Sequence, residues 1–156
     1  YNQDFNSRND KFYTDHRKGL WDKLQKLKSK YNIITEKLPY QEYINNLWLS
    51  KICISPFGMG EICFRDFEAV QFGTTLLKPK LDLKTIPQVF YEDTYLGVEY
   101  DWSNIEEVIC SFLDNYNDDY TNNLRNKIKE KFKYENICMH WYNIFSNLNN
   151  IKSYDR

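Results

Sequence analysis

The sequence has almost no net charge, and it lacks long apolar runs. Its 21 basic and 22 acidic residues leave a formal charge of −1 over 156 residues, so any phosphate binding must be local, and we expect no nucleic-acid partner. No apolar run approaches the ~20 residues of a membrane-spanning helix. No secretory signal peptide is visible, so we expect neither a membrane span nor secretion.

Metal-ligating residues are also scarce. The two histidines, His16 and His140, are far apart in the sequence, and the four cysteines do not have metal-ligand spacing. We therefore predict that there is no metal site. The cysteines are expected to be buried, reduced thiols in a cytoplasmic protein. They are Cys53, Cys63, Cys110 and Cys138.

The apolar content is sufficient for one packed domain. Hydrophobic residues make up 42% of the chain and aromatic residues 17%, and a chain of this length buries roughly 70% of its unfolded surface. Short apolar strands alternate with amphipathic helices, which predicts a three-layer α/β/α Rossmann-like domain with a mainly parallel sheet. We expect residues 1–156 to form this single domain, excised from a longer chain. Its sheet interior should include Ile52, Ile54, Leu76 and Leu77.

Periodicity and turn signals place the individual elements. Helices are predicted at about 14–29 and 39–50. A third helix should run from the Gly58–Gly60 turn to about residue 69, and a fourth from 103 or 104 to beyond 112. One or two further helices are predicted within 120–148. Strands are predicted at 31–35, 51–55, 74–78 and 95–100, and residues 80–93 are expected to form a loop with a short helical turn.

The most informative stretch is residues 55–69, which follow the predicted strand at 51–55. Gly58 and Gly60 allow a tight turn and the close approach of a ligand to the backbone. A helix that begins after such a turn directs free N–H groups and the positive end of its dipole at the turn. Phosphate is the ligand that most often binds at such a helix N-terminus.

Charged residues follow the turn at helical spacing. Glu61, Arg65 and Glu68 are separated by four and three residues, so a helix starting at Gly60 would project all three from one face. Such a face could bind a sugar. It could equally be a solvated salt-bridge stripe worth a few tenths of a kcal/mol per pair, and the spacing alone leaves both interpretations open.

Residues 55–69, continued by 72–79, resemble the donor-binding half of GT-B glycosyltransferases, in particular the exostosin-like and group 1-like branch. The resemblance lies in the order of parts: Ser-Pro at a strand end, a Gly-x-Gly turn, Arg65 three residues before Glu68-Ala69, then Gly73 and a strand into Lys78-Pro79. The commoner group 1 pattern separates its two glutamates by eight positions. Here Glu61 and Glu68 are separated by seven.

The resemblance implies roles for individual residues. Glu68 is expected to hold the ribose hydroxyls of a nucleotide-sugar, and Arg17 to meet the diphosphate, although a lone arginine near a helix start is ordinarily a surface residue. Tyr40 is expected to flank the base, although an aromatic residue at such a place is as often part of the core. Arg17 and Glu61 are the expected catalytic residues. The residues expected to bind the nucleotide-sugar are Gly58, Gly60, Glu61, Ile62, Arg65, Glu68, Tyr40 and Lys78.

The expected function is therefore that of a glycosyltransferase donor-binding domain. It would bind a nucleotide-diphosphate sugar without a required metal or cofactor, for transfer to the hydroxyl of a carbohydrate or glycoconjugate acceptor. The general base that deprotonates the acceptor hydroxyl would come from an acceptor-binding domain in the same or another chain. This chain alone is therefore expected to be catalytically incomplete. The alternative is a flavodoxin-like or receiver-like interaction domain in which the glycines form only a tight turn.

Overall fold

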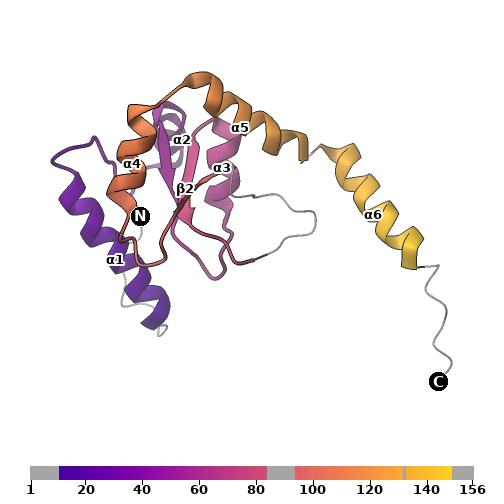
Figure 1. Ribbon diagram of the computed structural model, residues 1–156, viewed down its shortest axis with the longest axis horizontal. Coiled ribbons are helices and arrows are strands. Elements are labelled where there is room, and N and C mark those ends of the chain that lie inside the picture. The colour runs from indigo at the N-terminus through magenta and orange to yellow at the C-terminus, as the bar shows by residue number, and fades with distance from the viewer. Residues whose placement is uncertain (1–10, 84–93, 132, 149–156) are drawn as a thin grey trace.

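The structure of the chain is a computed structural model that describes residues 11–83, 94–131 and 133–148. In the described part, two helices precede the first strand, one helix separates the first strand from the second, and three helices follow the third strand (Figure 1). The helices are α1 (Lys11–Leu27), α2 (Tyr40–Leu49), α3 (Phe64–Phe72), α4 (Ile105–Asp114), α5 (Asp118–Lys131) and α6 (Tyr134–Leu148), and the strands are β1 (Ile52–Ile54), β2 (Thr75–Pro79) and β3 (Leu96–Val98).

The three strands form one parallel sheet in the order β1-β2-β3. In register, Cys53 lies opposite Leu76 and Lys78 opposite Gly97. Because all three strands run the same way, their carboxyl ends share one edge of the sheet, which we call the carboxyl edge. Ligands of open parallel sheets bind outside this edge.

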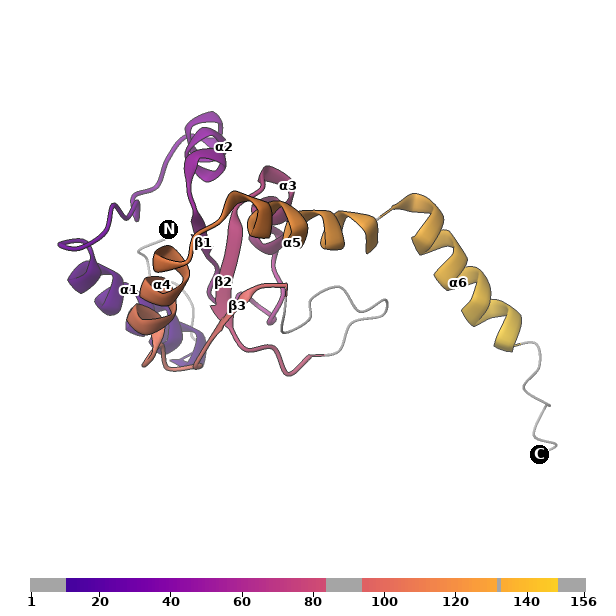
Figure 2. The same cartoon turned by 45° about the horizontal axis from the view of Figure 1, so that its top comes forward.

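Helices cover both faces of the sheet (Figure 2). On one face α1 and α4 pack against Leu77 and Val98, and on the other α2, α3 and α5 pack against Cys53 and Leu76. Adjacent residues Leu76 and Leu77 point to opposite faces, as the pleat of a strand requires, and both are almost fully buried. The predicted three-layer α/β/α class with a parallel sheet is therefore confirmed.

The predicted strand at 31–35 is wrong. This segment is irregular in the structure, because its apolar side chains Tyr31 and Ile33 pack against the core between α1 and α4 instead of joining the sheet. The Thr35 amide donates to the carboxylate of Glu36 at 3.0 Å, where a strand would have a ladder hydrogen bond.

The predicted start of the helix after the glycines is also wrong. α3 begins at Phe64, with Cys63 as its N-cap. Asp66 accepts a hydrogen bond from the Cys63 amide at 3.0 Å and so closes the first turn. Glu61 precedes the helix and does not share a helical face with Arg65 and Glu68.

Two burial predictions need correction. Of the four cysteines, which are all free thiols, Cys53 is buried, whereas Cys110 and Cys138 are exposed because they lie on outward positions of α4 and α6. In the sheet, Leu76 and Leu77 are buried, but Ile52 and Ile54 are only half-buried because β1 is a short edge strand.

The last helix, α6, extends away from the layered body (Figures 1 and 2). It carries large exposed apolar side chains, namely Tyr134, Met139, Trp141, Tyr142 and Phe145. In the described ranges no helix is both long and apolar enough to cross a membrane.

Candidate functional site

The segment between β1 and α3, residues 55–63, lies at the carboxyl edge and is called the glycine loop below. The Ser55 amide donates to the carbonyl of Leu77 at 2.8 Å, and the Gly58 amide donates to the carbonyl of Gly60 at 2.9 Å. Neither Gly58 nor Gly60 has a positive φ, in contrast to Gly73, the C-cap of α3, at φ 78°. The tight turn therefore forms without the left-handed backbone that glycine alone adopts easily.

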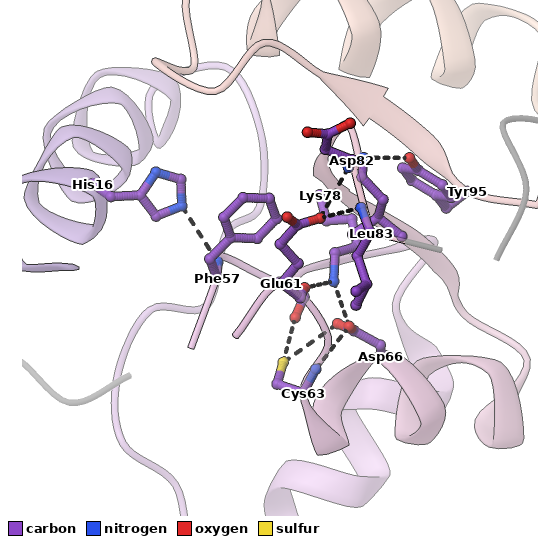
Figure 3. Close-up of polar contacts among 11 residues, drawn as sticks. His16, Phe57, Glu61, Cys63, Asp66, Lys78, Asp82, Leu83 and Tyr95 are labelled. Carbon is purple, nitrogen blue, oxygen red and sulfur yellow. Dashed lines mark hydrogen bonds and ion pairs between the residues drawn. The ribbon is translucent and has the colours of Figure 1, made fainter. Parts of the chain in front are cut away.

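Helix α1 holds the glycine loop from one side (Figure 3). The Phe57 amide donates to Nε2 of His16 at 3.3 Å, and Nε of Arg17 donates to the Phe57 carbonyl at 3.3 Å. Two consecutive residues of α1 thus hold both backbone groups of Phe57. Arg17 therefore lies beside the glycine loop.

His16 lies in an aromatic cluster beneath the loop. Its ring stacks on Phe57 and Tyr100, with centroids 5.4 and 4.6 Å away, and contacts Trp102 at 4.9 Å. Burial lowers the pKa of His16 to about 4, so the ring is neutral at pH 7. Since Nε2 accepts a hydrogen bond, the proton is assigned to Nδ1. A hydrogen bond with the backbone of Tyr100 opposes part of the lowering of this pKa.

A buried ion pair holds the loop from the other side. Lys78 and Asp66 are both fully buried, and the Lys78 ammonium contacts the Asp66 carboxylate and the carbonyl of Glu61 (Figure 3). Asp66 also caps α3 through the Cys63 amide. Lys78 therefore joins β2 to the loop and to the start of α3, and its side chain has no exposed surface.

The Glu61 side chain reaches the chain beyond β2. Its carboxylate accepts hydrogen bonds from the amides of Asp82 and Leu83 at 2.9 and 3.0 Å (Figure 3). Glu61 thus joins the glycine loop to the segment that follows the carboxyl end of β2.

Glu68 lies one turn into α3, beside α2. The Tyr43 hydroxyl donates to Oε2 of Glu68 at 2.8 Å. Burial first, and then this bond to Glu68, raise the pKa of Tyr43 far above its usual range. α3 follows the carboxyl end of β1, and α2 precedes the start of β1.

Of the sequence-predicted site residues, Arg17, Glu61 and Lys78 contact or belong to the glycine loop. Tyr40 is the first residue of α2 and is 71% exposed, and Ile62 is half-buried against the core. Sequence reasoning missed His16, Tyr43 and Asp66. The position of Asp66, three residues after the N-cap, is a capping-box signal, but cysteine is an unusual cap.

No protein-family model and no curated protein sequence matches this chain. Within the ranges that the structure describes, no three side chains of histidine, cysteine, aspartate or glutamate are grouped so that they could hold a metal ion. Fold and loop together define a small Rossmann-like α/β domain with a constrained glycine loop at the carboxyl edge of its sheet.

Proposed function

We propose that this chain is the donor-binding domain of a GT-B type glycosyltransferase, which binds a nucleoside diphosphate sugar at the glycine loop. The support is the agreement between the sequence resemblance and the geometry. The loop lies at the carboxyl edge, where parallel sheets bind ligands, and it leads into the N-terminus of α3, where backbone N–H groups favour phosphate.

The observation that carries the proposal is that the fold does not require glycine at position 60. Its φ is not positive, and a Cβ built there would meet no atom within 4 Å. The fold needs neither the conformational freedom nor the small size of glycine at this position. Close approach of a ligand from outside is therefore the best explanation for glycine at position 60.

The proposed roles follow from position. Arg17, beside the Phe57 carbonyl, and the loop amides would stabilise the diphosphate as the bond to the sugar breaks. Glu68 would accept hydrogen bonds from the ribose, and the exposed ring of Tyr40 would flank the base. Lys78 and Glu61 would act through the loop that they hold.

Under this proposal, the chain supplies only one side of the active-site cleft. The acceptor hydroxyl and the base that deprotonates it would be supplied by an acceptor-binding domain in the same or another chain. The isolated chain should therefore bind nucleotide-sugars without a metal and transfer little or no sugar.

A thermal-shift screen tests the proposal directly. The chain is melted with UDP, GDP, ADP and CMP, each with and without EDTA. A diphosphate present at about 100 times its Kd should add about 2.7 kcal/mol to the free energy of unfolding. Melting temperatures unchanged by all four nucleotides would instead favour a non-catalytic interaction domain.

Gly60→Ala should separate binding from folding. Because the added methyl group meets open space, the fold should be unaffected or gain about 0.4–1 kcal/mol from the stiffer unfolded chain. Affinity for the nucleotide found in the screen should fall at least about tenfold, or ~1.4 kcal/mol, because the methyl group blocks close approach of the phosphates.

The matched control for this variant is Gly19→Ala. Gly19 lies inside α1, where a Cβ would make an ordinary 3.8 Å contact with Trp102. This change should raise the melting temperature, since alanine favours a helix, and leave the affinity unchanged. If Gly60→Ala binds as tightly as Gly19→Ala, glycine at position 60 does not serve ligand approach.

A further inference from the structure

A small polar cavity lies at the amino edge of the sheet, where the strands begin. Its wall is formed by Arg125 of α5, by three apolar side chains and by four buried threonines, namely Thr74, Thr75, Thr94 and Thr121. Thr75 begins β2, and Thr94 precedes β3. The cavity is therefore at the opposite edge from the glycine loop, and the proposed nucleotide site does not include it.

The Arg125 side chain is half-buried and lacks an acceptor in the described part of the chain. Its Nε is shielded from solvent and makes no hydrogen bond there. None of the ion pairs among the described residues includes its guanidinium. A guanidinium stays charged and can only donate hydrogen bonds. A buried donor that has lost its bond to water costs free energy until it finds an acceptor.

The end of α3 attracts this cation without bonding to it. The Arg125 guanidinium lies over Gly73, the C-cap of α3, where an added Cβ would be 3.2 Å from Nη1. The negative end of the helix dipole favours a cation at such a place. The carbonyls of Ala69 and Val70 already accept from the amides of Thr74 and Gly73, at 2.9 and 3.2 Å. The acceptor for Nε must therefore come from elsewhere.

The threonine hydroxyls offer further donors. Those of Thr75 and Thr121 are 3.4 Å apart, beyond the usual range of about 2.5–3.0 Å for two oxygens. Hydroxyl protons rotate to suit a partner, so this weak pair can be exchanged for bonds to a ligand. The Thr74 hydroxyl, in contrast, donates to the carbonyl of Leu47. No carboxylate lines the cavity, so its wall has a net positive charge.

The size of the cavity limits the ligand. Its volume is about 10 Å³, which is about the room that one water molecule needs. Phosphate and sulfate are too large to enter. A charged wall with an unpaired N–H group favours a ligand that is negative and accepts hydrogen bonds, and a halide ion is little larger than water.

We infer that the cavity beside Arg125 binds a small monovalent anion of the size of chloride. The ion accepts from Nε of Arg125 and from rotated threonine hydroxyls, and it neutralises the guanidinium. Bound there, it joins α5 to the end of α3 and to the start of β2. This site does not depend on the proposed function.

The first test measures the stability of the whole chain by urea denaturation as sodium gluconate is exchanged for sodium chloride at constant sodium concentration. Gluconate is too large for the cavity. Each tenfold increase of free chloride above its Kd should raise the ratio of folded to unfolded chain about tenfold, and bromide should act in the same way. Equal stability in chloride and gluconate would mean that the cavity holds only water, and would overturn the inference.

Three variants locate the effect. Arg125→Met keeps a long side chain without the charge or Nε and should remove the dependence on chloride. Thr121→Val keeps the shape and should weaken chloride binding about two- to tenfold, as expected for one hydrogen bond. Lys129→Met is the matched control, because it removes one positive charge from an exposed position of the same helix, and it should keep the full dependence. Equal responses of Arg125→Met and Lys129→Met would overturn the inference.

A crystal of the wild-type chain soaked in sodium bromide tests the site without any variant. The anomalous scattering of bromide should give a peak within hydrogen-bonding reach of Nε of Arg125. A water molecule at this place, with bromide absent from it, would overturn the inference even if chloride stabilises the chain.

Discussion

Replacing Lys78 with methionine should lower the free energy of unfolding by about 3–5 kcal/mol. The substitution leaves the Asp66 carboxylate in a place where both side chains of the pair have no exposed surface. An unpaired charge there cannot be solvated by water, and methionine fills similar volume, so the loss measures the ion pair and not a cavity. Urea denaturation of the two proteins at pH 7 gives the difference.

Two further variants identify the cause. Adding Asp66→Asn to Lys78→Met should recover part of the loss, because asparagine removes the uncompensated charge and keeps an acceptor for the Cys63 amide. Lys80→Met breaks a surface pair with Glu99 in which both side chains are at least half exposed, and it should cost far less. Equal losses for Lys78→Met and Lys80→Met would show that the buried pair contributes nothing beyond a surface one.

The elements that could be predicted from the sequence are those in which the local hydrophobic pattern agrees with the burial of the segment in the fold. β1 and β2 are short runs of apolar and β-branched residues that end up covered on both faces, and α1 and α2 have clear apolar stripes. The segment 31–35 has the same local pattern as a strand, but its apolar side chains find their partners between two helices. Local pattern cannot tell which surface covers a side chain, and the strand was therefore wrongly predicted.

The same limit applies to the candidate site. The glycine loop carries a local signal, whereas Arg17 was assigned only from the resemblance, and the structure places the two together. His16, Tyr43 and Asp66 act through partners up to 41 residues away, as in the bond from Phe57 to His16. No local pattern marks a histidine that accepts from a distant amide, and the roles of His16 and Tyr43 follow only from the packing of α1 against the loop and of α2 against α3.

The stability of the chain should fall steeply between pH 6.5 and about pH 4 because of His16. Its pKa is about 4 in the folded chain, against an ordinary 6.5. Between these values the unfolded chain binds a proton that the folded chain does not, so unfolding becomes easier as the pH falls. At about 1.4 kcal/mol per pKa unit, the loss attributable to His16 reaches about 3 kcal/mol by pH 4.

His16→Phe isolates this contribution from that of the carboxylates, which titrate in every variant. Phenylalanine keeps an aromatic ring against Phe57, Tyr100 and Trp102 but cannot bind a proton. It should be less stable than wild type at pH 7, because the Phe57 amide loses its acceptor, and this difference should shrink as the pH falls towards 4. His140→Phe, on the projecting helix α6, should keep the wild-type slope. Parallel pH profiles for wild type and His16→Phe would mean that burial of a neutral His16 does not control acid stability, and that the amide of Phe57 is held by its neighbours instead.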